Sequence, residues 1–533
     1  MQGGWLIFGF LVATALLAVL SKRVNVAYPI VFVVAGALLG FIPGLPPVQL
    51  KPDLIFLLVL PPLLAGAGWT TDWNEFRANL RPIGLLAIGL VIFTTFAVAL
   101  IAHALVTGMS WPAAFALGAI VAPTDSIAAE AMSGQVTLPR RVLAIVSGES
   151  LVNDASALIV YRFAIAAAVA GAFDPNQVLP QFLFVSVFGT LVGLIVAAAA
   201  DLLIERLMAR NLADEVLVNV VILICPFASY LPAEALGASG VMAAVSGGIY
   251  LGRVSGKLQP EARILGAGVW EMMIYLLNAF VFLLLGLQLR GIVSALGGRS
   301  FEHLLGYGAA ISLAAIALRF LWIYPATYLP RMVSPSLRAR DPSPPWQYPF
   351  ILSWSGMRGI VSLAAALALP ATVAGGAAFP ARNEIIFITF CVIFATLVVM
   401  GLTLPWVARA LGFHDDGKMA KKEIAIRIRA LEDGLQRLKE LEPTFDSETE
   451  WEVEGRIVDE YRNRIEHLSG HLDGVATEAQ ATANEIDHRL QSEALGAERS
   501  AILAMRRRGE IPDDIYRNIE YDLDLAEARL ANT

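Results

Sequence analysis

Charged side chains are scarce in this sequence. Asp, Glu, Lys and Arg make up only 16% of its 533 residues, whereas 57% are hydrophobic. An ordinary soluble domain carries roughly 25% charged residues, so this composition argues against one. The charges are also unevenly distributed: apolar segments with short polar breaks run to about Leu411, and the chain from His414 onward is dense in charges of both signs. The sequence therefore predicts a membrane protein with a polar C-terminal tail.

Other absences narrow the class further. Cys225 and Cys391 are the only cysteines, and both lie in apolar segments, which argues against a disulfide framework. We find no basic face for nucleic acid, no Walker-type phosphate loop and no His-Glu-x-x-His motif. The string that starts at Gly148 fails the Gly-x-Ser-x-Gly pattern because its fifth residue is Val152. We therefore expect neither an ATPase nor a membrane-embedded hydrolase, and no cofactor.

A membrane-spanning helix needs roughly 20 apolar residues, or fewer where neighbouring helices shield it. Thirteen segments qualify: Trp5–Leu20, Val26–Ile42, Leu54–Ala67, Ile83–Val106, Ala113–Met132, Val142–Ala172, Val178–Ile204, Val216–Leu231, Val241–Leu251, Val269–Val293, Leu304–Tyr328, Phe350–Ala371 and Ile385–Leu411. The predicted fold class is an all-α membrane protein with about 13 transmembrane helices and a soluble helical tail.

Positive charges in alternate loops predict the orientation. One set of loops contains Lys22, Arg23, Arg77, Arg81, Arg140, Arg141, Arg206, Arg210, Arg253, Lys257, Arg263, Arg331, Arg338, Arg340, Arg409 and Lys418, and the other carries little beyond Lys51, Arg290, Arg299 and Arg382. Cytoplasmic loops carry the excess of Lys and Arg, so we expect the N-terminus outside a bacterial inner (plasma) membrane and the C-terminus in the cytoplasm. The predicted domains are a transmembrane domain at 1–412 and a cytoplasmic tail at 413–533.

The tail has the pattern of amphipathic helices that are too polar to span a membrane. Apolar residues recur at helical spacing at Leu431, Leu435, Leu438, Leu441, Ile457, Tyr461, Ile465 and Leu468. A regulatory or dimer-contact role and a plain soluble extension both fit this pattern.

The fifth apolar segment contains an acid beside a helix-breaking residue. Pro123 removes a backbone donor, and Asp125 follows it after one residue. Thr124 and Ser126 can hydrogen-bond the backbone locally. Irregular backbone at membrane depth is tolerated where it is buried in protein or lines a cavity, and secondary transporters bind ions at such breaks. A plain kinked helix is the alternative, but the adjacent acid favours an ion site.

The sixth segment presents three oxygen-bearing side chains on one helix face. Ser150, Asn153 and Asp154 are spaced i, i+3 and i+4. A hydroxyl, an amide carbonyl and a carboxylate are hard ligands suited to an alkali cation. A polar seam between helices would explain Ser150 or Asn153 alone, whereas an ionisable residue at membrane depth favours function. Burial also favours the protonated carboxyl, so we expect proton and cation to compete at Asp154.

Glu149 lies about 100° around the helix from Ser150 and need not face the ion. The cations within apolar segments are Arg162, Arg319 and Arg358. Arg358 lies in the string Gly356-Met357-Arg358-Gly359, whose glycines permit close helix approach. We predict a structural ion pair between Glu149 and Arg358. Arg358 balancing the ion-site carboxylates is the alternative.

With these motifs, the chain resembles sodium/proton antiporters of the cation:proton antiporter family, the group that includes bacterial NhaP-type proteins and animal sodium/hydrogen exchangers. The resemblance rests on the string from Gly148 to Asp154, on Thr124-Asp125 and on Gly356 to Gly359, in the expected order. It implies inverted repeats with two broken, crossing helices in segments five and twelve. It also implies a homodimer in membrane lipid, with a tail that binds a regulator or the partner protomer.

The same resemblance implies that Asp154 binds both the ion and the proton. Asn153, Ser150 and Asp125 would complete the cation site, and Thr124 would contribute through its backbone. An Asn before the key acid is typical of electroneutral members.

Two positions depart from the family pattern. Relatives often carry an acid in the third segment after a Pro-Pro pair, where this chain has Gly66, and many have Pro where this chain has Ser126. The missing acid removes one possible ligand and leaves the choice among Na⁺, K⁺ and Li⁺ open.

The predicted function is therefore secondary antiport by alternating access, with Na⁺ as the first candidate cation and H⁺ as the counter-ion. It is not an enzymatic function. A cation channel and a cation-coupled transporter of an organic solute are the alternatives. A solute site would need a roomier pocket with substrate-specific groups, which the motifs do not suggest.

Overall fold

The structure, a computed structural model, describes residues 2–43, 52–133, 138–170, 175–296, 301–373, 376–413, 417–473, 478–508 and 510–530. The chain divides into two compact units, Met1–His414 and Asp415–Thr533. Within the described residues, regular structure is helical apart from one isolated β-bridge between Thr372 and Ala378.

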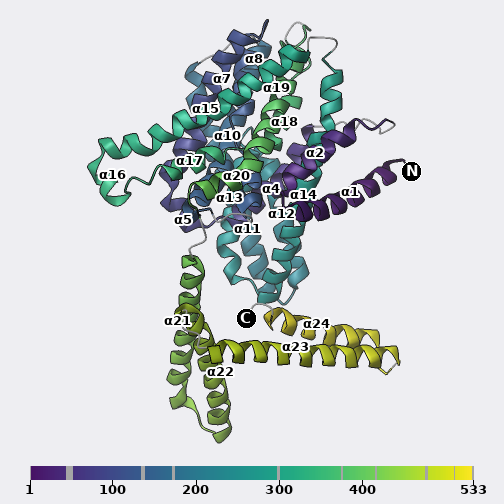
Figure 1. Ribbon diagram of the computed structural model, residues 1–533, viewed down its shortest axis with the longest axis vertical. Coiled ribbons are helices and arrows are strands. Elements are labelled where there is room, and N and C mark those ends of the chain that lie inside the picture. The colour runs from purple at the N-terminus through teal and green to yellow at the C-terminus, as the bar shows by residue number, and fades with distance from the viewer. Residues whose placement is uncertain are drawn as a thin grey trace. The chain divides into compact units, whose positions relative to one another are not determined.

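The first unit is a helical bundle (Figure 1). Its helices are α1 Gln2–Val24, α2 Tyr28–Gly40, α3 Pro52–Leu54, α4 Leu60–Thr70, α5 Trp73–Ala78, α6 Leu80–Gly84, α7 Val91–Leu105, α8 Trp111–Val121, α9 Ser126–Ser133, α10 Arg140–Ala170, α11 Pro175–Ala209, α12 Glu215–Ala235, α13 Gly240–Val254, α14 Pro260–Ser294, α15 Phe301–Val333, α16 Pro335–Arg340, α17 Gln347–Trp354, α18 Ile360–Leu367, α19 Arg382–Phe394 and α20 Gly401–Ala410. Short helical turns join some of them: η1 Ile55–Val59, η2 Leu85–Leu90, η3 Ser255–Lys257 and η4 Ala395–Met400.

Eight helices of the described part are long and apolar enough to cross a membrane: Pro52–Thr70, Leu80–Leu105, Arg140–Val169, Leu179–Ala209, Glu215–Ala235, Pro260–Ser294, Phe301–Val333 and Arg382–Ala410. The apolar helices α2 and α8 are shorter. Three of the eight contain a π-helical turn, η1, η2 or η4, which lets one extra residue enter the helix without ending it. The unit is therefore an all-helical, multi-span membrane protein.

Helix α10 carries the predicted polar face and lies inside the bundle (Figure 1). It contacts α8 and α9 as well as α4, α7, α13 and α17. Helix α8 is almost wholly buried beside it, from Ala113 to Val121. This packing places the two motif-bearing segments side by side.

Helices α2 and α14 approach each other through glycines. A Cβ atom at Gly36 would overlap the carbonyl oxygen of Leu283, and one at Gly286 would overlap that of Val33. Small residues at a helix crossing allow backbones to touch, which gives dense packing where lipid removes the hydrophobic driving force. The pair is therefore packed backbone to backbone along this stretch.

The second unit contains α21 Lys418–Leu441, the short turn η5 Glu442–Thr444, α22 Glu448–Asp473, α23 Glu478–Arg507 and α24 Asp513–Leu530. Helix α21 packs on α22, and α23 packs on α24. A small core of Ile502, Tyr516 and Leu523 fixes the second pair. Helices α21 and α22 contain the residues whose helical spacing predicted amphipathic helices, and in each pair one helix face packs against the neighbour.

Candidate functional site

Two helices of the first unit are interrupted inside the bundle. Helix α8 ends at Val121 and α9 begins at Ser126, so the interruption contains Pro123 and Asp125. Helix α17 ends at Trp354 and α18 begins at Ile360, so the second interruption contains Gly356 to Gly359. Helical structure stops at Pro123, where the sequence predicted broken backbone, and again in the twelfth segment, where the family resemblance implied a break.

A main-chain hydrogen bond joins the two interruptions. The N–H of Asp125 donates to the carbonyl of Met357 at 2.7 Å. The carboxylate of Asp125 accepts the N–H of Ile127 at 2.8 Å, which satisfies one of the free donors at the start of α9. A Cβ atom at position 359 would collide with the Asp125 carboxylate, so glycine there is what allows the two segments to approach this closely.

Arg358 binds backbone carbonyls at both helix interruptions and one on the continuous helix α15. Its guanidinium donates to Val121 at 3.2 Å, to Gly356 at 2.6 Å and to Ala315 at 3.3 Å, and its own N–H donates to the hydroxyl of Thr396. The side chain is fully buried. A carbonyl without a partner in a membrane interior costs several kcal/mol, and Arg358 removes that cost at both interruptions.

Glu149 pairs with a different arginine from the one predicted. Arg319 on α15 donates to its two carboxylate oxygens at 2.5 and 2.8 Å, and both side chains are almost completely buried. Arg319 also donates to the carbonyl of Leu352 on α17. The prediction that Glu149 pairs with Arg358 was therefore wrong: Arg358 is occupied by carbonyls, and α15 presents its own arginine to Glu149. A buried Glu in an ion pair was the correct part of that prediction.

The polar face of α10 is hydrogen-bonded to the first interruption. The amide nitrogen of Asn153 donates to the carbonyl of Thr124 at 3.2 Å and to its hydroxyl at 3.0 Å. The Thr124 hydroxyl donates in turn to Glu149 at 3.0 Å, and the Ser150 hydroxyl accepts the N–H of Ser126 at 3.2 Å. Glu149 therefore does contact this region, through Thr124, although its place around the helix suggested otherwise.

The predicted site residues other than Asn153 line a small cavity. It has a volume of about 50 Å³ and is lined by Thr124, Asp125, Ser126, Ser150 and Asp154, together with apolar residues of α4 and the start of α18. A space this size holds a water molecule or a small ion. Asp154 is 8% exposed, and its carboxylate accepts no hydrogen bond from the residues that the structure describes. The amide oxygen of Asn153 is likewise buried without a donor in that part of the chain.

Gly66 does not line this cavity. A Cβ atom there would lie 2.6 Å from Ile274 and 3.4 Å from Trp270, both on α14. A carboxylate could enter at position 66 only if these side chains moved. Among the lining residues, Asp125 and Asp154 are therefore the two acids.

Broken helices around a buried pair of acids define a secondary ion transporter. The comparisons with known proteins make the class specific: residues 10–410 match the model of the transmembrane sodium/hydrogen exchangers. This chain belongs to that family, and it is a monovalent cation/proton antiporter rather than an enzyme.

Individual relatives agree with this assignment. A protein of Mycobacterium bovis described as an uncharacterised Na⁺/H⁺ exchanger is 32% identical over 98% of this chain and 97% of its own length. The sodium, potassium, lithium and rubidium/H⁺ antiporter of Bacillus subtilis is 31% identical over 98% of this chain and 78% of its own length. The sodium proton antiporter MjNhaP1 of Methanocaldococcus jannaschii has a similar fold, with a TM-score of 0.57 over 76% of this chain and 98% of that structure, at 17% identity.

Sequence reasoning missed two features of the site. It considered Arg319 but did not choose it, because choosing between two arginines in apolar segments requires knowing how α15 is rotated and where the break between α17 and α18 lies. It also did not foresee that Met357 would bind Asp125 through its carbonyl, a contact for which no side chain gives a signal.

Proposed function

We propose that the cavity between Asp125 and Asp154 is the place where the cation and the proton exchange, and that Asp154 carries the proton. The observation that supports this most directly is the position of the Asp154 carboxylate at a cavity of about 50 Å³, without a hydrogen-bond donor from the described residues. A buried carboxylate needs either a cation or a proton to offset its charge. Loss of the proton therefore favours binding of the cation, and loss of the cation favours binding of the proton.

The remaining ligands are the oxygens already held around the cavity. Asp125 contributes the second carboxylate, Ser150 a hydroxyl, and Thr124 its backbone carbonyl, with Asn153 fixing Thr124 in place. All are hard oxygen ligands, which suit Na⁺, Li⁺ or K⁺. The relative from Bacillus subtilis is named for transport of several alkali cations, and we propose Na⁺ as the first candidate here, with K⁺ and Li⁺ as further substrates.

We further propose electroneutral exchange. Asn153, the residue before Asp154, is neutral, so Asp154 is the one group of that pair that exchanges a proton. One cation then replaces one proton, and the loaded site has the same charge in both directions. The two interrupted helices would belong to inverted repeats in a thirteen-helix fold, in which alternating access exposes the site to each side in turn.

The proposed setting is a homodimer in the bacterial plasma membrane, with the N-terminus outside and the tail in the cytoplasm. The Lys and Arg bias of the loops supports this orientation. The tail would bind a regulator or the partner protomer.

Proton flux in proteoliposomes tests the mechanism. A trapped pH-sensitive dye reports proton movement as Na⁺, K⁺ or Li⁺ is added in turn, with the membrane potential clamped at several values. We expect saturable proton movement opposite to the cation, at a rate independent of the clamped potential. A rate that follows the potential would contradict electroneutrality, and cation flux without proton movement would contradict the exchange site itself.

A further inference from the structure

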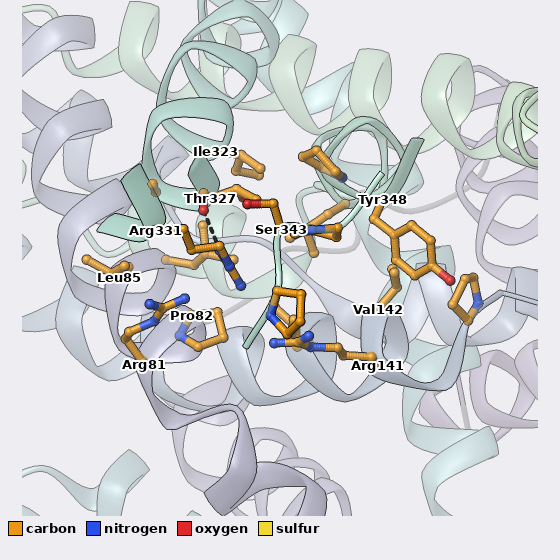
Figure 2. A pocket seen from close by; sticks show the side chains of 18 of the residues that line it. Arg81, Pro82, Leu85, Arg141, Val142, Ile323, Thr327, Arg331, Ser343 and Tyr348 are labelled. Carbon is orange, nitrogen blue, oxygen red and sulfur yellow. Dashed lines mark hydrogen bonds between the residues drawn. The ribbon is translucent and has the colours of Figure 1, made fainter. Parts of the chain in front are cut away.

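A second, larger cavity lies in the first unit, away from the candidate ion site. Its volume is about 520 Å³, and it is formed by the start of α6 and η2, the start of α10, the end of α15, and the segment that leads into α17 (Figure 2). It shares no lining residue with the cavity at Asp154. The size is in the range of small-molecule sites, roughly 300–1,000 Å³.

Arginines from three separate helices line this cavity. Arg81 comes from α6, Arg141 from α10 and Arg331 from α15. Figure 2 shows the guanidinium groups of Arg81 and Arg331 on one side of the cavity and Tyr348 on the other. A fourth arginine, Arg140, also lines it but is engaged by Asp72 at 2.7 Å.

These three arginines share a single acid. Asp341 lies 3.3 Å from Arg81, 2.9 Å from Arg141 and 2.6 Å from Arg331. Burial alone would raise the pKa of Asp341, but a hydrogen bond from Arg141 and the charges of all three arginines lower it below its ordinary value. Asp341 is therefore an anion near neutral pH, and the cluster keeps an excess of two positive charges.

Arg81 and Arg141 also keep unused hydrogen-bonding capacity, whereas Arg331 is buried and donates to Thr327 and Asp341. The Nη1 atom of Arg81 is buried and has no acceptor among the described residues. Each guanidinium carries five N–H donors, and the exposed fractions of the Arg81 and Arg141 side chains are 32% and 41%. An anion entering the cavity would find free donors and net positive charge together.

The rest of the lining is mostly apolar. Leu85, Leu86, Ile323, Val142 and Leu352 contribute to the wall, together with several prolines. A bare inorganic anion would fill only a fraction of this volume. The combination suits a ligand with a compact anionic group and an attached apolar or glycerol portion.

We propose that this cavity is a binding site for a phosphate ester, with Arg81 and Arg141 holding the phosphate and Arg331 adding positive charge to the wall. Arginine matches phosphate oxygens with its planar fork of donors and stays charged at all physiological pH values. Basic pockets between membrane helices bind phospholipid headgroups, and a soluble phosphate ester has the same anionic group. A phospholipid and a soluble phosphate ester would present the same phosphate to the arginines. They differ in that only the phospholipid also has acyl chains.

Binding to the full-length purified protein tests the proposal. The protein is stripped of lipid in a neutral detergent. Native mass spectrometry then measures retention of added phosphatidylglycerol or phosphatidylcholine. A second arm measures the thermal unfolding midpoint with inorganic phosphate or glycerol 3-phosphate, against chloride at the same ionic strength.

Three variants are compared with the parent. Arg81→Gln combined with Arg141→Gln removes two phosphate donors. Ala326→Phe fills the cavity without altering an arginine, so it tests the site even if the double variant is unstable. Arg206→Gln combined with Arg210→Gln is the control, because it removes two exposed charges, one on α11 and one directly after it, that do not line the cavity.

We expect the parent and the control to retain phosphatidylglycerol in preference to phosphatidylcholine. The two cavity variants should bind it about tenfold more weakly, the effect of losing a charge-assisted contact. A matching thermal shift with glycerol 3-phosphate would show that the phosphate group suffices, and its absence would assign the site to lipid. Equal retention by the parent and both cavity variants, or an equal loss in the control, would overturn the proposal.

Discussion

The main-chain N–H of Asp125 donates to the carbonyl of Met357 at 2.7 Å, and this bond joins two interrupted helices that lie more than 200 residues apart in sequence. The bond gives a hydrogen-bond partner to one backbone N–H of the first interruption and to one carbonyl of the second. Buried backbone groups in a membrane interior need such partners. The position of the Asp125 carboxylate therefore depends on both segments, and a change in either segment should displace it.

Gly359→Ala tests this dependence. The added Cβ atom would collide with the Asp125 carboxylate, so we expect most cation/proton exchange to be lost, with a stability cost of about 1–3 kcal/mol from overpacking. Proteoliposome flux and thermal unfolding measure the two effects. Gly268→Ala on α14 is the control, because no atom lies within 4 Å of its Cβ position. Normal exchange in Gly359→Ala would show that the exact placement of Asp125 is unimportant.

Asp154→Asn should abolish exchange while leaving the protein folded, because the amide can neither carry the proton nor offset a cation's charge. Asp125→Asn should weaken apparent cation affinity and reduce the rate. Proton release on addition of Na⁺ to detergent-solubilised protein gives a direct readout for both variants. Asp433→Asn, an exposed acid of the tail, is the matched control. Proton release by Asp154→Asn at the parent level would remove Asp154 from the mechanism.

Arg319→Gln should reduce stability by about 3–5 kcal/mol, because it leaves the buried Glu149 carboxylate without its cation. Arg162→Gln breaks a half-exposed pair with Glu234 and should cost about 0–1 kcal/mol. The unfolding midpoint of each variant in detergent measures its stability loss, and we expect the larger shift for Arg319→Gln. Equal shifts in both variants would mean that the Glu149–Arg319 pair is not a buried structural contact.

Asp341→Asn should lower stability by about 1.5 kcal/mol at pH 7, through the loss of charge-assisted hydrogen bonds. Because the folded-state pKa of Asp341 lies below its ordinary value of 3.8, its contribution is present above that value and is lost as the pH falls through the folded-state pKa. The difference in unfolding midpoint between parent and variant should therefore be full at pH 7 and shrink below about pH 4. A difference that grew on acidification would contradict this assignment.

The first helix interruption and the acid pair were predictable because their signals are local, whereas the second interruption was expected only from the resemblance to the family. Pro123 breaks the helix at its own position, and Ser150, Asn153 and Asp154 share a helix face by spacing alone. The structure brings Asp125, Ser150 and Asp154 to one cavity, as that reasoning anticipated.

The partners of the buried arginines were not predictable in the same way. Arg319 and Arg358 both lie in apolar segments, and charge alone does not distinguish them as partners of Glu149. The choice depends on how α15 is rotated and on where the break between α17 and α18 lies. The carbonyls of Val121 and Gly356 accept from Arg358 because the helices end there and leave these groups without intrahelical partners. The arginine cavity was missed for a similar reason: Arg81, Arg141 and Arg331 were interpreted one loop at a time as indicators of orientation.

The glycine contacts between α2 and α14 set a limit on how the protein can move. Where main chain touches main chain, no side chains are present that could exchange rotamers and let one helix slide past the other. These two helices should therefore move together as one rigid body. The motion that would expose the ion site first to one side of the membrane and then to the other must therefore occur at other helix interfaces, where side chains pack against one another.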